Sequence, residues 1–389
     1  MSPTLPLPPG STIGVLGGGQ LGRMLALATR RMGYRIVTWI GGPDTGPAGV
    51  ADHVIEEPFD SPAGLAAFLE RAQVATVEFE NIPRSLLEAV AAKIPLMPGA
   101  QAVAICQHRE RETRFLEENG IPCARFAVIE NAEQLRTALA ELPDNGGILK
   151  TAEFGYDGKG QLSVNRASDP EAVWEAFATP RAVLEERIDL AAELSVLVVR
   201  DGSGRALSYD PAENFHRDHI LDVSIVPARL EPSLLDEARA IALRVAEALD
   251  YRGLLAVEFF LSGDGRLLVN EMAPRPHNSG HHTIDSCITS QFQQQIRTVC
   301  GFNPGSPRQH SPAVMVNLLG DVWPAPEKHP DWSPVLADPA CFLHLYGKRL
   351  AKPGRKMGHF TVLGETIDDA LARAASLRSS LGLPPLPEA

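Results

Sequence analysis

Strand and helix patterns alternate along the first hundred residues, and this alternation constrains the fold more than any other feature of the sequence. Apolar runs typical of strands occupy residues 12–16, 35–40, 75–79 and 94–97, and amphipathic stretches typical of helices occupy 20–32, 63–71 and 84–92. Strands that alternate with helices form a parallel sheet with right-handed βαβ connections. We therefore predict a parallel, Rossmann-like α/β domain over residues 1–121, which ends in a helix from 102 to 119.

The pattern changes after residue 121, where two further units are predicted. Residues 122–190 contain short strands and two helices around a glycine-rich loop, which is typical of a small α+β lid domain. Residues 191–389 contain longer strands, a helix over 234–249, and a hairpin formed by 254–261 and 266–271. Three domains agree with a length of 389 residues, at roughly 100–200 residues per domain.

Composition argues against several classes of protein. The net charge of −12 lacks the basic footprint of a general nucleic-acid binder, and no segment approaches the roughly 18 apolar residues that can cross a membrane. Residues 1–10 contain no Lys or Arg and lack the pattern of a signal peptide. The five cysteines are scattered and never spaced as CxxC, so we expect a cytoplasmic protein without a disulfide framework.

A glycine-rich turn, Gly17-Gly18-Gly19-Gln20-Leu21-Gly22, joins the first strand to the first helix. Glycines allow a sharp turn and a close approach to a ligand, and a helix N-terminus favours an anion. A dinucleotide site would also need an acidic residue at the end of the second strand, but that strand ends in Trp39-Ile40-Gly41-Gly42. We favour a small-substrate pocket here over an NAD site or a purely structural turn.

A second glycine-rich loop follows the strand that ends in Lys150. The segment Phe154-Gly155-Tyr156-Asp157-Gly158-Lys159-Gly160-Gln161 carries three glycines whose N–H groups could surround phosphate oxygens. Lys150 and Lys159 would neutralise charge beside them. The loop lacks the GKS or GKT of a Walker A motif, and its alternative interpretation is a surface turn. On a small separate domain, such a loop suits a lid that closes over ATP.

Two glutamates flank the turn of the predicted hairpin. Glu258 precedes Gly263 by five residues and Glu271 follows Gly265 by six, so the two carboxylates face each other across the hairpin. Like charges in this position repel each other, and their burial is unfavourable unless a cation is present. Hard oxygen ligands from Glu258, Asn270 and Glu271 suit Mg²⁺. The alternative is a pairing register that leaves one glutamate in solvent.

A polar segment, Met272-Ala273-Pro274-Arg275-Pro276-His277-Asn278-Ser279-Gly280-His281-His282, follows the hairpin directly. Its histidines could indicate a zinc site, but no HExxH motif or cysteine partner supports one. We favour a substrate-facing loop.

The densest positive segment of this acidic chain lies near its end. Lys348-Arg349-Leu350-Ala351-Lys352-Pro353-Gly354-Arg355-Lys356 places a Pro-Gly turn between two predicted strands. Such segments are usually solvated faces. The turn would aim Lys348, Arg355 and Lys356 at one place, which suits a terminal phosphate.

Seven segments in order resemble one known family. They read GGGQLGRM, EFENIP, GYDGKGQ, AENFH, VEFF, NEMAPRPHNSGHHT and YGKRLAKPGRKMGH. The sequence resembles 5-(carboxyamino)imidazole ribonucleotide synthases, which are ATP-grasp ligases of purine biosynthesis. The resemblance covers nearly the whole chain. It implies a preATP-grasp domain, a lid and a C-terminal nucleotide-binding domain, with ATP between two antiparallel sheets.

The resemblance also implies roles for individual residues. Glu258 and Glu271 would bind Mg²⁺, with two ions expected. The residues that would contact ATP are Arg109, Lys150, Gly155, Tyr156, Asp157, Gly158, Lys159, Gly160, Gln161, Glu185, Glu186, Arg187, Ile188, Glu193, His216, Asn270 and Glu271.

Further implied residues surround the other two substrates, bicarbonate and aminoimidazole ribonucleotide. The ribonucleotide would lie against Gln20, Leu21, Glu78 and Glu80, with its 5′-phosphate on Lys348, Arg355 and Lys356. Bicarbonate and its activated form would lie among Tyr156, Lys159, Arg275, His277 and Asn278. His277 or Glu78 could accept the proton of the amine.

The expected reaction is ATP-dependent carboxylation of the amino group of aminoimidazole ribonucleotide through carboxyphosphate. The resemblance further implies a homodimer, and a mutase is the expected recipient of the unstable product. Three alternatives stay open: a sister ligase that adds formate to glycinamide ribonucleotide, a nicotinamide oxidoreductase suggested by Gly17–Gly22, and a non-catalytic nucleotide-binding regulator.

Overall fold

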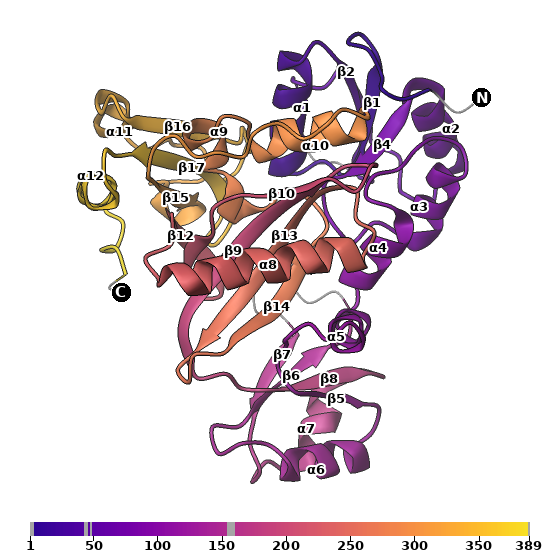
Figure 1. Cartoon of the computed structure of the whole chain (residues 1–389), viewed down its shortest axis with the longest axis vertical. Helices are drawn as coiled ribbons and strands as arrows, with labels where there is room; N and C mark the ends of the chain where they lie inside the picture. The colour runs from indigo at the N-terminus through magenta and orange to yellow at the C-terminus, as the bar shows by residue number, and fades with distance from the viewer. Residues whose placement is uncertain (1–3, 43–45, 47–48, 154–159, 388–389) are drawn as a thin grey trace.

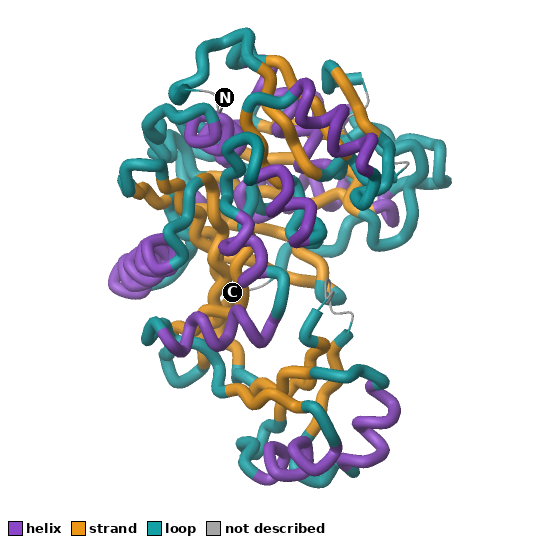
Figure 2. The backbone as a smooth tube through the Cα atoms, turned by 90° about the vertical axis from the view of Figure 1, so that its right-hand side faces the viewer, coloured by secondary structure: helices purple, strands orange, loops and turns teal. Residues whose placement is uncertain are grey.

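The computed structural model describes residues 4–42, 46, 49–153 and 160–387, and its strands form three sheets. Figures 1 and 2 both show the small sheet with its two helices as a lobe apart from the body that holds the other two sheets. Within this described part, no helix is both long enough and apolar enough to cross a bilayer.

The first sheet is parallel, as predicted, with the strand order β3-β2-β1-β4. Its strands are β1 (Thr12–Leu16), β2 (Arg35–Trp39), β3 (His53–Ile55) and β4 (Val74–Val77), with α1 (Gln20–Arg31), α2 (Pro62–Arg71) and α3 (Arg84–Ala91) between or after them. The strand predicted over 94–97 forms only an isolated parallel bridge from Leu96 to Ala75. Pro95 and Pro98 flank this bridge, and proline has no N–H to extend a ladder.

The helix predicted over 102–119 is two helices, α4 (Ala100–Cys106) and α5 (Arg109–Glu118). His108 between them has an extended backbone and forms an antiparallel bridge with Glu153. The side chain of Gln107 donates to two carbonyls in the loop after β4. These tertiary contacts outweigh helix propensity, and the break directs Arg109 into the interior.

The small lobe holds a four-stranded antiparallel sheet with the order β5-β8-β6-β7. Its strands are β5 (Phe126–Ile129), β6 (Gly147–Thr151), β7 (Gln161–Val164) and β8 (Ala182–Glu186), and its helices are α6 (Ala132–Ala140) and α7 (Pro170–Phe177). Leu135, Leu149 and Leu184 belong to a core of its own. A separate core suits a lobe that can move as a unit.

The largest sheet follows the order β14-β13-β9-β11-β12-β15-β17-β16, with β10 paired to β9. Its strands are β9 (Leu190–Arg200), β10 (Ala206–Ser208), β11 (Ala212–Arg217), β12 (Ile220–Val226), β13 (Gly253–Ser262), β14 (Leu267–Ala273), β15 (Ala313–Leu319), β16 (Cys341–Leu345) and β17 (Lys356–Leu363). The basic segment near the end of the chain connects β16 to β17, so it belongs to the same sheet as the carboxylate hairpin.

Helices on this sheet fix its position against the first domain. They are α8 (Pro232–Ala248), α9 (Thr283–Ser286), α10 (Gln291–Val299), α11 (Ser333–Ala337) and α12 (Ile367–Ser380). Phe292 and Ile296 of α10 share one buried cluster with Met24 and Leu25 of α1. This contact holds the ends of β1 and β4 close to the loop that follows β14.

Candidate active site

Two adjoining cavities lie where the three predicted domains meet. The larger, about 490 Å³, is lined by the loops after β1 and β4, by the small lobe, and by the segment that follows β14. The smaller, about 230 Å³, lies between the small sheet and the hairpin of β13 and β14. Arg109, Lys150 and Gln161 line both. Shared walls make the two cavities one elongated site.

The smaller cavity is a slot between two antiparallel sheets. Ile148 and Ile188 line it from the small lobe, and Phe260 and Leu268 line it from the hairpin. The residues predicted to contact ATP at 185–188 run along the same slot. Apolar walls beside the backbone of residues 185–188 suit a flat aromatic ring such as a purine.

Arg109 ties the small lobe to the hairpin. Its Nε and Nη2 donate to the two oxygens of Glu185 at 2.5 and 3.0 Å, and its Nη1 donates to the Asn270 carbonyl at 2.7 Å. Lys150 Nζ donates to Glu185 Oε2 at 2.7 Å. Burial opposes the ionisation of Glu185, but Arg109 and Lys150 outweigh it and lower the pKa of Glu185 to about 2. Two cationic side chains are thus fixed at the shared wall, which suits a polyphosphate.

Sequence reasoning missed Glu112, which lies on the other side of Arg109. Its Oε2 accepts from Arg109 Nη1 at 3.0 Å, and its Oε1 accepts from the Met272 N–H at 2.6 Å. The side chain is buried and lines the larger cavity. The available signal was its spacing of three residues from Arg109, because residues three apart lie on one face of a helix.

Glu258 and Glu271 are direct partners across the hairpin, as predicted. Phe259 pairs with Val269, so the register shifts by one residue between the two pairs and Asn270 is the extra residue of a β-bulge. Enclosure by the surrounding protein and the charge of Glu258 both raise the pKa of Glu271, although its side chain is open to the larger cavity. Two carboxylates that repel each other fit a divalent cation such as Mg²⁺, and the amide oxygen of Asn270 accepts from Arg109 Nη2 at 3.1 Å.

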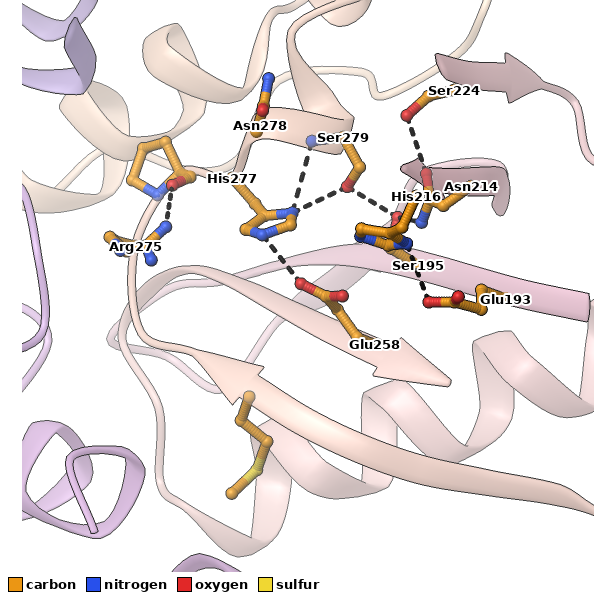
Figure 3. Close-up of polar contacts among 12 residues, drawn as sticks. Glu193, Ser195, Asn214, His216, Ser224, Glu258, Arg275, His277, Asn278 and Ser279 are labelled. Carbon is orange, nitrogen blue, oxygen red and sulfur yellow. Dashed lines mark hydrogen bonds and ion pairs between the residues drawn. The ribbon is translucent and has the colours of Figure 1, made fainter. Parts of the chain in front are cut away.

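Glu258 also pairs with His277, whose Nε2 lies 2.8 Å from Glu258 Oε1 (Figure 3). His281 contacts Gln291 instead, and His282 contacts Ser286. Within the part of the chain that the structure describes, no group of three or more His, Cys, Asp or Glu gathers as a metal site. The histidines therefore do not form the alternative zinc cluster.

The first glycine turn binds a carboxylate of the chain itself. Glu78 Oε1 accepts from the backbone N–H groups of Leu21 and Gly22, each at 3.2 Å. A Cβ on Gly19 would lie 2.6 Å from the same oxygen, so this approach needs glycine. Glu78 occupies the N–H groups that a dinucleotide site presents to pyrophosphate. This supports the predicted small-substrate pocket, since Gln20, Leu21 and Glu78 line the larger cavity.

Glu80 and Arg275 form a two-pronged ion pair inside the larger cavity. Arg275 Nε donates to Glu80 Oε2 at 2.5 Å, and Nη2 donates to Oε1 at 3.0 Å. Burial opposes the ionisation of Glu80, but Arg275 outweighs it and lowers the pKa of Glu80. Glu80, which is predicted to contact the substrate, thus holds Arg275, which is predicted to be catalytic. Asn278, a third predicted site residue, lines the same cavity and donates to Asn317 Oδ1 at 3.0 Å.

The basic segment divides into two parts. Lys348 Nζ donates to Gln20 Oε1 at 2.8 Å and to the Lys356 carbonyl at 2.6 Å. Lys356 lines the larger cavity. Arg355 Nη1 donates to the Leu350 carbonyl of its own loop at 2.8 Å, and Arg355 lines neither cavity. The two lysines lie together, and the role of Arg355 as a phosphate contact stays a prediction.

Some of the other residues predicted to contact ATP do not line either cavity. His216 Nδ1 lies 2.9 Å from Glu193 Oε2, and the pair lines neither cavity (Figure 3). Burial lowers the pKa of His216, but Glu193 outweighs it and raises that pKa overall. Gly160 and Gln161 line the larger cavity. Tyr156, Lys159 and the other predicted lid residues Gly155, Asp157 and Gly158 lie outside the described residues.

Three family models match successive parts of the chain. Residues 11–107 match the ribonucleotide synthetase preATP-grasp domain, residues 114–292 match the ATP-grasp domain, and residues 313–373 match the phosphoribosylaminoimidazole carboxylase C-terminal domain. The chain is also 43% identical over 359 residues to the N5-carboxyaminoimidazole ribonucleotide synthase of Brucella melitensis, covering 91% of this chain and 97% of that protein. Its identity to the Bacillus subtilis synthase is 39% over 361 residues, covering 93% of each.

Solved structures show the same relationship in three dimensions. An ADP complex of N5-carboxyaminoimidazole ribonucleotide synthetase superposes with a TM-score of 0.88 at 40% identity, covering 96% of this chain and 98% of that one. An Aspergillus clavatus synthase in complex with ADP and 5-aminoimidazole ribonucleotide superposes with a TM-score of 0.86 at 29% identity, covering 96% and 99%. The chain therefore belongs to the N5-carboxyaminoimidazole ribonucleotide synthase family of ATP-dependent ligases, with the ATP-grasp fold.

Proposed function

We propose that the chain uses ATP and bicarbonate to carboxylate the amino group of 5-aminoimidazole ribonucleotide in purine biosynthesis. The observation that carries this proposal is the elongated double cavity with the facing pair Glu258 and Glu271 beside it. One compartment suits a purine ring and the other is large and polar, which suits a second nucleotide. The relative solved with ADP and 5-aminoimidazole ribonucleotide supports the same pair of ligands.

In this proposal ATP lies across the smaller cavity. Its adenine packs in the apolar slot along 185–188, and its phosphates extend past Arg109 and Lys150 toward the larger cavity. Glu258 and Glu271, with Asn270, would hold Mg²⁺, and their four carboxylate oxygens could serve two ions. When bound, Mg²⁺ would neutralise charge on the phosphate oxygens.

The ribonucleotide occupies the larger cavity in the same proposal. Its aglycone and ribose lie against Gln20, Leu21 and Glu78, and its 5′-phosphate lies toward Lys348 and Lys356. The hydrogen bond from Lys348 to Gln20 supports this arrangement, because it joins the two proposed contact regions. Arg275, held by Glu80, presents its guanidinium to the cavity wall where bicarbonate would lie.

The reaction then follows from ordinary phosphoryl and acyl transfer chemistry. An oxygen of bicarbonate attacks the γ-phosphorus, the bond to the β–γ bridging oxygen breaks, and ADP leaves with carboxyphosphate formed. The amine nitrogen attacks the carboxyl carbon, either directly or after release of CO₂, phosphate departs, and the nitrogen loses one proton. Carboxyphosphate hydrolyses in water, so closure of the small lobe over the site would protect it.

A coupled assay of ADP release tests this function. Purified protein with MgATP should release ADP only when both bicarbonate and 5-aminoimidazole ribonucleotide are present, and the ribonucleotide should gain one carboxyl group. Formate with glycinamide ribonucleotide serves as the comparison, because a sister ligase would use that pair instead. ADP release with formate and none with bicarbonate would refute the proposal.

Two finer expectations rest on the same proposal. We infer a homodimer, which the family resemblance implies. Sedimentation equilibrium at micromolar protein should give twice the monomer mass, and a single monomer mass would refute it.

The carbamate product is unstable, so a mutase that accepts it is the expected next enzyme. A purified mutase should raise the yield of rearranged product without changing the rate of ADP release.

A further inference from the structure

A row of polar residues crosses the large sheet at the carboxylate pair. Glu258 of β13 is the direct partner of Glu271 on β14 and of Ser195 on β9. Side chains of directly opposed residues lie on the same face of a sheet. Ser195 is 2% exposed, so its hydroxyl must find its partners within the protein.

The partners of Ser195 form a chain of hydrogen bonds that ends at His277 (Figure 3). Ser224 Oγ donates to Asn214 Oδ1 at 2.8 Å, and Asn214 Nδ2 donates to Ser195 Oγ at 2.9 Å. Ser195 Oγ donates to Ser279 Oγ at 2.7 Å, and Ser279 Oγ lies 2.9 Å from His277 Nδ1. Every serine and the asparagine in this relay are buried.

The relay has a direction, which decides how His277 carries its proton. Because Ser279 Oγ accepts from Ser195, its own hydrogen is available for His277 Nδ1. The backbone N–H of Ser279 also points at Nδ1, at 3.3 Å, and an amide N–H can only donate. Two donors at Nδ1 require it to be an acceptor, so the ring hydrogen lies on Nε2, 2.8 Å from Glu258 Oε1.

We propose that Ser279 and Ser195 are positioning residues that hold His277 in the Nε2–H tautomer, so that His277 donates a hydrogen bond to Glu258. The proposal deepens the proposed carboxylase function and rests on it for its catalytic part. Partners of this kind orient the carboxylate that binds a metal and affect activity without touching substrate. Nε2 already bears its hydrogen, so it has no lone pair for the proton of the amine.

Nuclear magnetic resonance of the unligated full chain tests the tautomer without any substrate. Protein labelled with ¹⁵N-histidine should show His277 with the hydrogen on Nε2, and a His277→Gln variant identifies its signals by their loss. Ser195→Ala and Ser279→Ala should shift His277 toward a mixture of tautomers. Ser286→Ala is the matched control, because it removes a buried serine 2.8 Å from Nδ1 of the neighbouring His282, which lines neither cavity. This control should leave the His277 signals unchanged.

Steady-state kinetics supply the second readout. Ser195→Ala and Ser279→Ala should lower kcat by about tenfold, the lower end of the effect of outer partners at metal sites, with the KM for ATP little changed. Ser286→Ala should keep the wild-type kcat. His277→Gln should retain more activity than His277→Leu, because the glutamine amide can donate but cannot accept a proton at neutral pH.

The tautomer and the turnover number are independent tests. A hydrogen on Nδ1 in the wild-type protein would overturn it, whatever the activity. A Ser195→Ala protein that loses turnover but keeps the Nε2–H tautomer would also overturn it, since the serine would then act only through packing. Absence of carboxylase activity in the wild type would refute the proposed function, and the tautomer measurement would still stand.

Discussion

Glu258 and Glu271 stand directly opposite each other because β14 carries one extra residue, Asn270, at a β-bulge. In a regular register, without the bulge, Asn270 would pair with Glu258 and Glu271 would fall out of register with it. Bulges are frequent beside active sites, where they re-aim side chains. The arrangement concentrates negative charge at one point of an otherwise apolar ribbon, and its energetic consequences can be measured.

Glu271→Gln should stabilise the unligated protein and disable the ligated one. A neutral amide removes the repulsion with Glu258, so the free energy of unfolding without Mg²⁺ should rise by about 0.5–1 kcal/mol. Turnover should fall roughly 100-fold, because a charged ligand of the proposed cation is lost. Urea denaturation and ADP release measure the two effects. Glu247→Gln, on the exposed face of α8, is the matched control and should change neither. A variant that is less stable without Mg²⁺ would contradict the repulsion.

Glu80→Gln should reduce turnover through Arg275. The substitution removes the charge that holds the guanidinium by two hydrogen bonds, so Arg275 should lose its fixed orientation. We expect kcat to fall by roughly 10- to 100-fold, as for the loss of a charged hydrogen bond, with the KM for ATP unchanged. A double-mutant cycle with Arg275→Ala measures the coupling. If Glu80 acts only through Arg275, the double variant should match Arg275→Ala, and additive losses would refute that role.

Stability at acid pH should depend on Glu185. Its pKa in the folded protein is lowered to about 2, below the ordinary value of about 4.3. A lowered pKa gives stability that is fully present above the ordinary value and is lost as the pH falls toward 2. The difference in free energy of unfolding between wild type and Glu185→Gln should therefore be largest near neutral pH, roughly 3 kcal/mol. Urea denaturation from pH 7 to 2.5 should show this difference shrinking, and a constant difference would contradict the account.

The two cationic residues beside the Pro-Gly turn should differ in function. Lys356→Ala should raise the KM for the ribonucleotide by roughly 10- to 100-fold, because Lys356 lines the larger cavity and a charged hydrogen bond to phosphate would be lost. Arg355→Ala should have a smaller effect, because its guanidinium donates to the Leu350 carbonyl within its own loop. Equal effects of the two substitutions would show that Arg355 turns toward the ribonucleotide when it binds.

Local patterns predicted much of the fold but not where tertiary contacts outweigh them. Periodicity identified the parallel sheet and the carboxylate hairpin. It missed α10, whose sequence is QFQQQIRTV, because three of its glutamines are buried and hydrogen-bonded rather than exposed. It also merged α4 with α5, since the break depends on a bridge from His108 to a residue 45 positions away, Glu153.

In the candidate site, too, local patterns predicted some features, and others depend on tertiary contacts. The facing glutamates were predictable because the position of each follows from its distance to the same turn. Glu258 lies five residues before that turn and Glu271 six residues after it, and the difference of one residue corresponds to the bulge. The pairing of Arg275 with Glu80 joins residues 195 positions apart, and nothing in either local pattern indicates it. Ser195 lies within an apolar strand, and only the neighbouring strands and the loop after β14 reveal its partners.

Transfer of an oxygen atom from bicarbonate to phosphate tests the proposed activation of bicarbonate by ATP. Protein incubated with MgATP, 5-aminoimidazole ribonucleotide and ¹⁸O-labelled bicarbonate should release phosphate that carries one ¹⁸O atom, because a bicarbonate oxygen attacks the γ-phosphorus and stays on it when the carboxyl group is transferred. The label is read by mass spectrometry of the phosphate after brief turnover. Unlabelled phosphate formed together with carboxylated product would contradict activation of bicarbonate by ATP.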